Sequence, residues 1–207
     1  MTTPRRIRML AIAAALAAGA CSSDPGPIDQ KPYEADLQAY RVRKDVAFRS
    51  SPESPIPDDQ RATFAGLDYY PIDPAARVPA YLTEDRTGTP LIIQLETSKG
   101  QHDSFRRVGS LGFTLGAASY KLTAFASVNA SSMDRLFVPF GDLTNKSETY
   151  GGGRYVDLER TPTGLYDLDF NRAYHPNCVY NHDWECPVPP RENRLPVAIR
   201  AGERLRQ

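Results

Sequence analysis

Apolar residues fall into two periods along the chain, one helical and one of two residues. Between Tyr33 and Arg49, the apolar positions Leu37, Tyr40, Ala47 and Phe48 recur near helical spacing. The Ser-Ser-Pro that follows ends the pattern, because a residue before proline is pushed out of the helical region. The spacing therefore predicts one helix close to the N-terminal side of the chain.

Beyond this helix, apolar and polar residues alternate, or short apolar runs are broken by glycine, proline and asparagine. The predicted strands are Thr63–Tyr70, Val78–Leu82, Leu91–Thr97, Ser104–Leu111, Phe113–Ala117, Tyr120–Val128, Leu136–Pro139, Arg154–Glu159, Leu165–Asn171 and Pro196–Arg200. Short strands at this spacing favour a closed arrangement. The chain is therefore predicted to be mainly β, an antiparallel barrel or sandwich of about eight to ten short strands, with one N-terminal α-helix.

A third apolar segment indicates where the protein works. Three arginines precede the run Met9–Ala20, which ends at Cys21. The run is too short to cross the ~30 Å of hydrocarbon in a bilayer, and its flanks are typical of an export signal. Ala18-Gly19-Ala20 resembles the site that precedes a lipidated cysteine. We expect lipidation at Cys21, with ordinary cleavage after Ala20 as the alternative.

These features divide the chain into a signal peptide (1–20), a lipidated cysteine with a flexible tether (21–32) and one β-rich domain (33–205). Localisation is expected in the cell envelope, through the lipid anchor; a serine after Cys21 favours the outer membrane, or a periplasm-facing position, if the host is Gram-negative. Residues 1–20 hold three of the 25 Lys and Arg, so 22 remain against 25 Asp and Glu. A mildly acidic surface without a basic cluster argues against nucleic acid as a partner.

The segment from His175 to Cys186 is the densest in chemistry, with two thiols, two imidazoles and two carboxylates. In an oxidising envelope, the simplest interpretation is a disulfide between Cys178 and Cys186. The alternative is a tetrahedral metal site formed by His175, Cys178, His182 and Cys186, although the spacing matches no common zinc module. An enzyme, metal- or redox-dependent, would use this cluster. The residues indicate no particular cofactor.

A glycine run from Tyr150 to Arg154 leads into the predicted hairpin of Arg154–Glu159 with Leu165–Asn171. The run allows either a close approach of two strands or an anion pocket completed by Arg154. If Glu159 lies opposite Leu165, Arg154 reaches the edge of the apolar face and needs a carboxylate or a ligand. The same register gathers three carboxylates, Asp157, Asp167 and Asp169, on the opposite face. Pairing with Arg172 or Arg194, or a divalent cation, would offset their repulsion.

Four motifs stand out along the chain: F-R-S-S-P-E-S-P-I-P (Phe48–Pro57), F-V-P-F-G-D-L-T-N-K-S-E-T-Y-G-G-G-R-Y-V-D-L (Phe137–Leu158), L-D-F-N-R-A-Y-H-P-N-C (Leu168–Cys178) and C-P-V-P-P-R-E-N-R-L-P-V-A-I-R-A-G-E (Cys186–Glu203). Together they resemble the domain-of-unknown-function family 1684. The resemblance covers roughly residues 33–205 and implies asparagine at the position of His175 in much of the family. It implies no activity.

Polar residues of the glycine run, the hairpin and the segments that follow it are expected to come together at one end of the barrel. The candidate ligand-binding residues are Tyr150, Arg154, Asp169, Asn171, Arg172, Tyr174 and Asn193. They favour a binding module for a small polar ligand or a cell-envelope component. Two alternatives remain, an enzyme that uses the cluster at 175–186 and a structural envelope module without a ligand.

Overall fold

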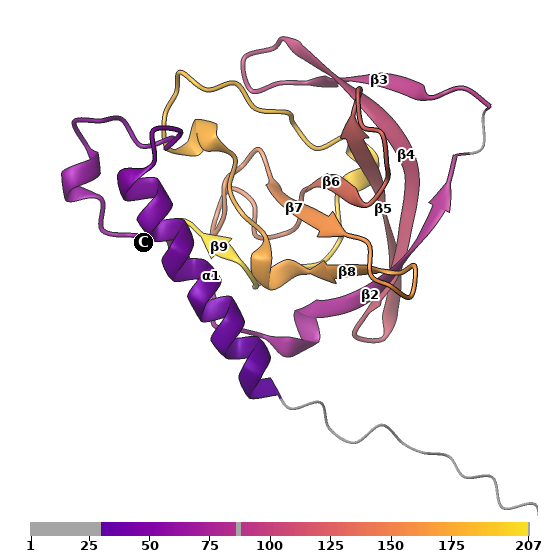
Figure 1. Ribbon diagram of the computed structural model, residues 1–207, viewed down its shortest axis with the longest axis horizontal. Coiled ribbons are helices and arrows are strands. Elements are labelled where there is room, and N and C mark those ends of the chain that lie inside the picture. The colour runs from indigo at the N-terminus through magenta and orange to yellow at the C-terminus, as the bar shows by residue number, and fades with distance from the viewer. Residues whose placement is uncertain (1–29, 86–87, 207) are drawn as a thin grey trace, which may run out of the picture.

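The computed structural model describes residues 30–85 and 88–206, so the expected signal peptide, Cys21 and most of the tether lie outside the described residues. The described chain is mainly β, with one α-helix near its N-terminal side (Figure 1). Its elements are α1 (Gln30–Ser50), β1 (Asp68–Tyr69), β2 (Arg77–Glu84), β3 (Leu91–Glu96), β4 (His102–Leu115), β5 (Ala118–Ser127), β6 (Arg135–Phe140), β7 (Arg154–Glu159), β8 (Tyr166–Asp169) and β9 (Glu203–Arg204). Short 3₁₀ turns connect several of them.

Seven strands form one antiparallel sheet in the order β7-β6-β5-β4-β2-β8, with β3 paired to β4. The sheet curls until its two end strands approach, and one bridge between Arg160 and Tyr166 joins them just beyond β7. The result is a nearly closed barrel (Figure 1). This confirms the predicted fold class, since closure removes the exposed edges of a sheet.

Strand β4 corrects the prediction that Ser104–Leu111 and Phe113–Ala117 are separate strands. The chain runs through Gly112 as one strand of 14 residues. Its register with β5 shifts between Arg107 and Gly109, and its neighbour changes from β3 to β2 at the same place. A Cβ at Gly109 would lie 2.2 Å from the carbonyl oxygen of Thr83, so β2 passes this point at backbone contact distance.

The barrel interior is filled by alternate residues of the strands. Its side chains include Leu111, Leu122, Leu136, Val156, Leu158, Leu168 and Phe170, all buried. Because β7 and β8 place every second residue inside, their intervening residues face outward. The core therefore determines which carboxylates are available on the outside of these two strands.

Helix α1 packs against the C-terminal part of the chain and extends beyond both ends of the predicted Tyr33–Arg49. Leu37 and Phe48 form its buried side. Lys44 pairs with the buried carboxylate of Glu203 at 2.6 Å. In the part of the chain that the structure describes, no helix is both long enough and apolar enough to cross a bilayer.

Two predicted strands are largely wrong. Within Thr63–Tyr70, only Asp68–Tyr69 forms a paired strand, and its partner is β9. Pro196–Arg200 is irregular and pairs with no strand along its length. The carbonyl of Ile199 accepts a hydrogen bond from the buried Arg154 guanidinium.

The predicted β7–β8 hairpin register is also wrong. β7 pairs with β6 and β8 pairs with β2, and the bridge joins Arg160, not Glu159, to the start of β8. The predicted register put Leu158 opposite Tyr166, whereas the bridge puts Arg160 there, a shift of two residues. An even shift preserves the two faces. The outward position predicted for Asp157 and Asp167 therefore agrees with the structure.

Candidate functional site

The outer faces of β7 and β8 form one side of a groove of about 470 Å³, here called the acidic groove. Helix α1 contributes Tyr40, and the segment after β8 contributes Arg172 and Tyr174. The full lining is Tyr40, Arg135, Asp157, Glu159, Asp167, Asp169, Arg172 and Tyr174. The period of two in both strands brings the carboxylates to the same face.

Carboxylates outnumber cations in the acidic groove, since its lining has four carboxylates and two guanidinium groups, and only Asp167 is paired with a further one, that of Arg77. Glu159 and Arg135 lie 3.7 Å apart, with side chains 79% and 82% exposed. An ion pair this open to solvent contributes little, on the order of 0–1 kcal/mol. The Glu159 carboxylate is therefore available to a ligand at little cost.

Two other carboxylates, the exposed Asp157 and the buried Asp169, accept hydrogen bonds from within the chain. Asp157 accepts a bond of 2.8 Å from the hydroxyl of Tyr174. Asp169 is buried and accepts bonds of 2.9 Å from the hydroxyl of Tyr33, and Arg172 lies 3.4 Å away. Burial, and then the charge of Asp157, raises the pKa of Tyr174. The hydroxyl consequently remains protonated and continues to donate to Asp157.

Next to the acidic groove lies a second cavity of about 600 Å³, here called the apolar hollow. Its lining is Tyr33, Pro74, Arg77, Val78, Pro79, Thr161, Thr163, Leu165, Tyr166 and Asp167. Asp167 lines both spaces, and Arg77 binds it at 2.6 Å while lying over the ring of Tyr33 at 4.7 Å. A charged space and an apolar space therefore adjoin on this side of the barrel.

Arg154 was predicted as a ligand-binding residue, but its side chain is buried and paired within the chain. Its side chain is fully buried and pairs at 2.9 Å with the equally buried carboxylate of Asp142. It also donates to the carbonyls of Ile199, Ala201 and Glu203. The structure thus supplies the carboxylate partner that an arginine on an apolar face requires, and it places Arg154 away from the acidic groove.

The amide side chains of Asn171 and Asn193 are fully buried as well. The side-chain oxygen of Asn193 accepts a hydrogen bond from the N–H of Thr123. Its side-chain NH₂ donates to the carbonyls of Thr123 and Pro139. Asn171 bonds the hydroxyl of Tyr33 and the backbone of Asp73. Each amide joins two segments of the fold.

Of the seven predicted ligand residues, the structure brings Asp169, Arg172 and Tyr174 together in the acidic groove. The sequence analysis missed Tyr40 because its helical spacing marked it as a core residue. It missed Arg135 because an arginine at the start of a strand carries no local signal. Their position follows from strand pairing and helix packing.

The cysteine loop, Cys178–Cys186, differs from the prediction. Both cysteines are buried free thiols, and the predicted disulfide is not formed in this structure. The N–H of Cys178 donates to the sulfur of Cys186 at 3.1 Å. The two cysteines therefore lie side by side.

The alternative four-ligand metal site is not assembled. His175 is buried, and its Nε2 accepts a bond of 3.3 Å from the N–H of Tyr150. Its backbone N–H donates to Glu203 at 2.7 Å, whereas His182 is exposed. Among residues 30–85 and 88–206, no three His, Cys, Asp or Glu side chains gather as a metal site.

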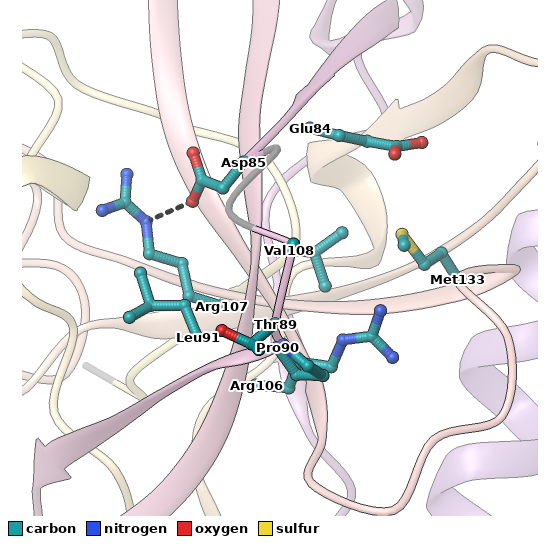
Figure 2. A pocket seen from close by; sticks show the side chains of 10 residues that line it. Glu84, Asp85, Thr89, Pro90, Leu91, Arg106, Arg107, Val108 and Met133 are labelled. Carbon is teal, nitrogen blue, oxygen red and sulfur yellow. Dashed lines mark ion pairs between the residues drawn. The ribbon is translucent and has the colours of Figure 1, made fainter.

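A further cavity of about 340 Å³ lies beside the β4 bulge (Figure 2). Figure 2 shows Asp85 and Arg107 pointing toward one another, at 3.1 Å. Arg106 donates to the carbonyl of Ala130 at 3.4 Å. Both guanidinium groups are thus engaged by the chain itself, which makes this cavity a weaker candidate than the acidic groove.

The fold places this protein in the class of nearly closed antiparallel β-barrels with an N-terminal helix packed along the barrel. The family model "Protein of unknown function (DUF1684)" matches residues 62–204, so the chain belongs to this family. A solution NMR structure of an uncharacterized protein from Haloarcula marismortui is similar, with 40% sequence identity and a TM-score of 0.66. The alignment covers 86% of this chain and 96% of that one. No curated protein matches the chain.

Proposed function

We propose that this protein is a binding module for a small polar ligand, and that the acidic groove receives a positively charged group of that ligand. The observation that carries this proposal is the excess of carboxylates in one cavity: four carboxylates line it with two guanidinium groups, and one carboxylate, Asp167, is paired with a third, that of Arg77. A charge-assisted hydrogen bond to a carboxylate is roughly twice as strong as a neutral one. Ammonium groups are natural partners for such a surface.

The neighbouring space refines the ligand class. Small-molecule sites are commonly largely apolar clefts of roughly 300–1,000 Å³ with a few polar groups that fix orientation. The apolar hollow and the acidic groove together have this character, with Asp167 between them. The proposed ligand is therefore an amine with an apolar portion, of the kind that an amphipathic envelope component supplies.

We also propose that the protein is exported and lipid-anchored at Cys21, facing the envelope. Helix α1 begins at Gln30, nine residues after Cys21. A fully extended chain spans at most ~3.6 Å per residue, so the anchor would hold the barrel within roughly 30 Å of the membrane. Export would also bring Cys178 and Cys186 into an oxidising compartment, where we expect a disulfide.

Binding is tested with pairs of probes that differ in charge. Hexylamine is compared with hexanol, and glucosamine with N-acetylglucosamine, by calorimetry at low salt. The charged member of each pair is expected to bind more tightly, and added salt to weaken it. Equal binding of charged and neutral probes, or no binding of any probe, would favour the structural envelope module.

The variant for this test is Asp157→Asn with Glu159→Gln, which removes two charges and keeps the side-chain shapes. The amide oxygen that Asp157→Asn introduces still accepts a hydrogen bond from the hydroxyl of Tyr174. Affinity for hexylamine is expected to fall about tenfold, or about 1.4 kcal/mol. The matched control is Glu96→Gln, an exposed carboxylate on β3 outside both cavities, which is expected to leave affinity unchanged. An equal loss in the control would assign the effect to overall charge and contradict the groove.

A further inference from the structure

Helix α1 carries an exposed apolar stripe on the side that faces away from the barrel. Successive residues of a helix are turned by about 100°, which places a set of apolar residues opposite the buried Leu37. This set, here called the outer stripe, is Pro32, Ala35, Ala39, Val42 and Val46, and all of its members are exposed. Val42 and Val46 are 62% and 52% exposed. Figure 1 shows α1 along the outside of the barrel, and the described chain leaves the outer stripe open.

The charges that flank the outer stripe are positive. Arg43 lies on one flank, and Lys31 and Arg49 lie on the other, each exposed and about 60° from the centre of the stripe. Arg49 donates to the carbonyl of Phe64 at 3.2 Å. Arg43 makes no ion pair or hydrogen bond with the rest of the described chain. The outer stripe therefore has the charge pattern of a helix that lies on an anionic surface.

The acidic residues of α1 are turned toward the barrel. Glu34 and Asp45 are half-buried, and Asp45 accepts a hydrogen bond from the N–H of Leu67 at 3.0 Å. Asp36 pairs with Arg172 at 2.5 Å, across the contact between helix and barrel. No carboxylate of the described helix therefore repels an anionic surface at the outer stripe.

The position of α1 in the chain indicates which surface meets the outer stripe. The helix begins nine residues after Cys21, the proposed site of the lipid anchor. A stretch of that length reaches at most ~30 Å, so the anchor keeps α1 near the bilayer at a high local concentration. An interfacial helix binds a bilayer through its apolar side and through cations that attract anionic headgroups. This step rests on the proposed lipid anchor.

We propose that the outer stripe is a membrane-docking face, with Val42 and Val46 in the headgroup region and Arg43 among anionic lipid headgroups. A lipid chain alone attaches a protein without orienting it, whereas a second contact through α1 fixes which side faces the bilayer. Tyr33 and Tyr40, on the opposite side of the same helix, line the apolar hollow and the acidic groove. Docking holds both cavities one helix diameter, ~10 Å, from the lipid surface, where an amphipathic amine accumulates.

The test uses the protein purified after export and reconstituted into, or mixed with, vesicles of phosphatidylcholine and phosphatidylglycerol. Its mass reports the proposed acyl group at Cys21 separately from the contact of the helix. Trp184→Phe removes the one tryptophan of the chain, and Val42→Trp supplies a probe in the outer stripe. Lipids with brominated acyl chains are expected to quench about half of its fluorescence or more, because a docked stripe reaches the boundary of the acyl chains. The control probe is Tyr81→Trp in the same background, at a tyrosine that is 63% exposed on β2, and it is expected to keep its fluorescence.

Failure of the anchor and failure of the docking face give different results. An acyl group at Cys21 without quenching of the Val42→Trp probe would overturn the docking face and leave the anchor intact. A missing acyl group would contradict the anchor, and quenching in the mixed sample would still support the docking face. A dimer in detergent that Val46→Asn dissociates would assign the outer stripe to a second copy of the chain and overturn the proposal.

The apolar contribution is tested in the same probe background. Val46→Asn is expected to lower the ratio of docked to undocked helix about fivefold, because a polar amide replaces an apolar side chain of similar helix propensity. Val128→Asn, at a 42% exposed valine outside α1, is the control and is expected to leave the ratio unchanged.

The charged contribution is tested by Arg43→Gln. The ratio is expected to fall about fivefold in vesicles with phosphatidylglycerol and to stay unchanged in phosphatidylcholine alone. Lys121→Gln, at an exposed lysine on β5, is the control for net charge. Losses of equal size in the controls would overturn the docking face, because they would show that no particular face of the protein meets the bilayer.

Discussion

The guanidinium of Arg154 ties the C-terminal segment of the chain to the barrel wall. Its charge is balanced by Asp142, and its remaining donors bind the carbonyls of Ile199, Ala201 and Glu203, in the segment that leads into β9. Asp142 in turn accepts the N–H of Thr144 and the N–H of Ile199. A single buried ion pair thus organises two segments that form no regular ladder with one another.

Replacement of Arg154 by methionine keeps most of the side-chain volume and removes the charge. Asp142 would then be a buried carboxylate without its cation, and three carbonyls would lose a donor. The expected loss is about 3–5 kcal/mol in the free energy of unfolding, measured by urea denaturation. In the double variant Arg154→Met with Asp142→Asn, part of this loss is expected to return, because no unpaired charge remains. A loss below about 1 kcal/mol in the single variant would contradict a structural role.

At the scale of elements, the bulge in β4 decides how the barrel closes. It lies where β4 exchanges β3 for β2 as its neighbour, and bulges bend a strand and increase its twist. Gly109 is required there because any side chain would meet the backbone of β2. Gly112, on the same strand, has only the carbonyl of Tyr81 near it, at 4.0 Å.

This contrast gives a matched pair of substitutions. Gly109→Ala is expected to destabilise the protein by about 2–3 kcal/mol, because a Cβ at 2.2 Å from the Thr83 carbonyl oxygen forces β2 to move. Gly112→Ala is expected to change stability by less than about 0.5 kcal/mol. Thermal unfolding of the two variants and the parent measures the difference. Similar losses at both positions would show that the bulge tolerates a side chain.

The sequence predicts an element well when the interactions that form it are between residues close together in the chain, and poorly when they are between distant residues. The helix and the faces of β7 and β8 follow from local periodicity, so the outward Asp157 and Asp167 could be predicted. Gly112 looked like a break, yet a glycine fits within a paired strand when its neighbours hold it. The path of segment 199–203 could not be predicted, because its carbonyls accept hydrogen bonds from Arg154, which lies 45 positions or more upstream.

The site follows the same rule. The carboxylates of the acidic groove come from two strands whose alternation is visible in the sequence, whereas Tyr40 and Arg135 reach it through packing of distant elements. Arg154 was predicted as a ligand residue because an arginine on an apolar face needs a partner. Asn171 and Asn193 were added to the predicted site because their segments were expected to meet at the same end of the barrel. The structure supplies partners for all three from the chain itself.

At the scale of the whole molecule, helix α1, the barrel and the C-terminus meet at one buried charged cluster. Glu203 accepts bonds from the backbone N–H of His175 and the hydroxyl of Tyr180, and pairs with Lys44 of the helix. The imidazole of His175 lies against this cluster, with Nδ1 3.8 Å from Glu203. The protonation state of His175 is therefore coupled to the contact between helix and barrel.

Stability should depend on pH through this histidine. Burial, followed by the positive charges of Arg154 and Lys44, lowers the pKa of His175 from 6.5 to about 3. Below pH 6.5 the unfolded chain binds a proton there and the folded chain does not, so protons favour unfolding. The contribution of His175 to stability is therefore complete above pH 6.5 and is lost as the pH falls from 6.5 toward 3. Within this window the slope approaches about 1.4 kcal/mol per pH unit.

The variant His175→Gln tests this coupling, because an amide does not titrate and the glutamine oxygen can take the place of Nε2 as the acceptor of the Tyr150 N–H. Urea unfolding is compared at pH 7 and pH 5. The parent is expected to lose about 2 kcal/mol more than the variant between these values, while all other titrating groups contribute equally to both. A parallel decline of both proteins would show that His175 becomes protonated in the folded state. The ion pair that it would then form with Glu203 would outweigh its burial and the repulsion from Lys44 and Arg154.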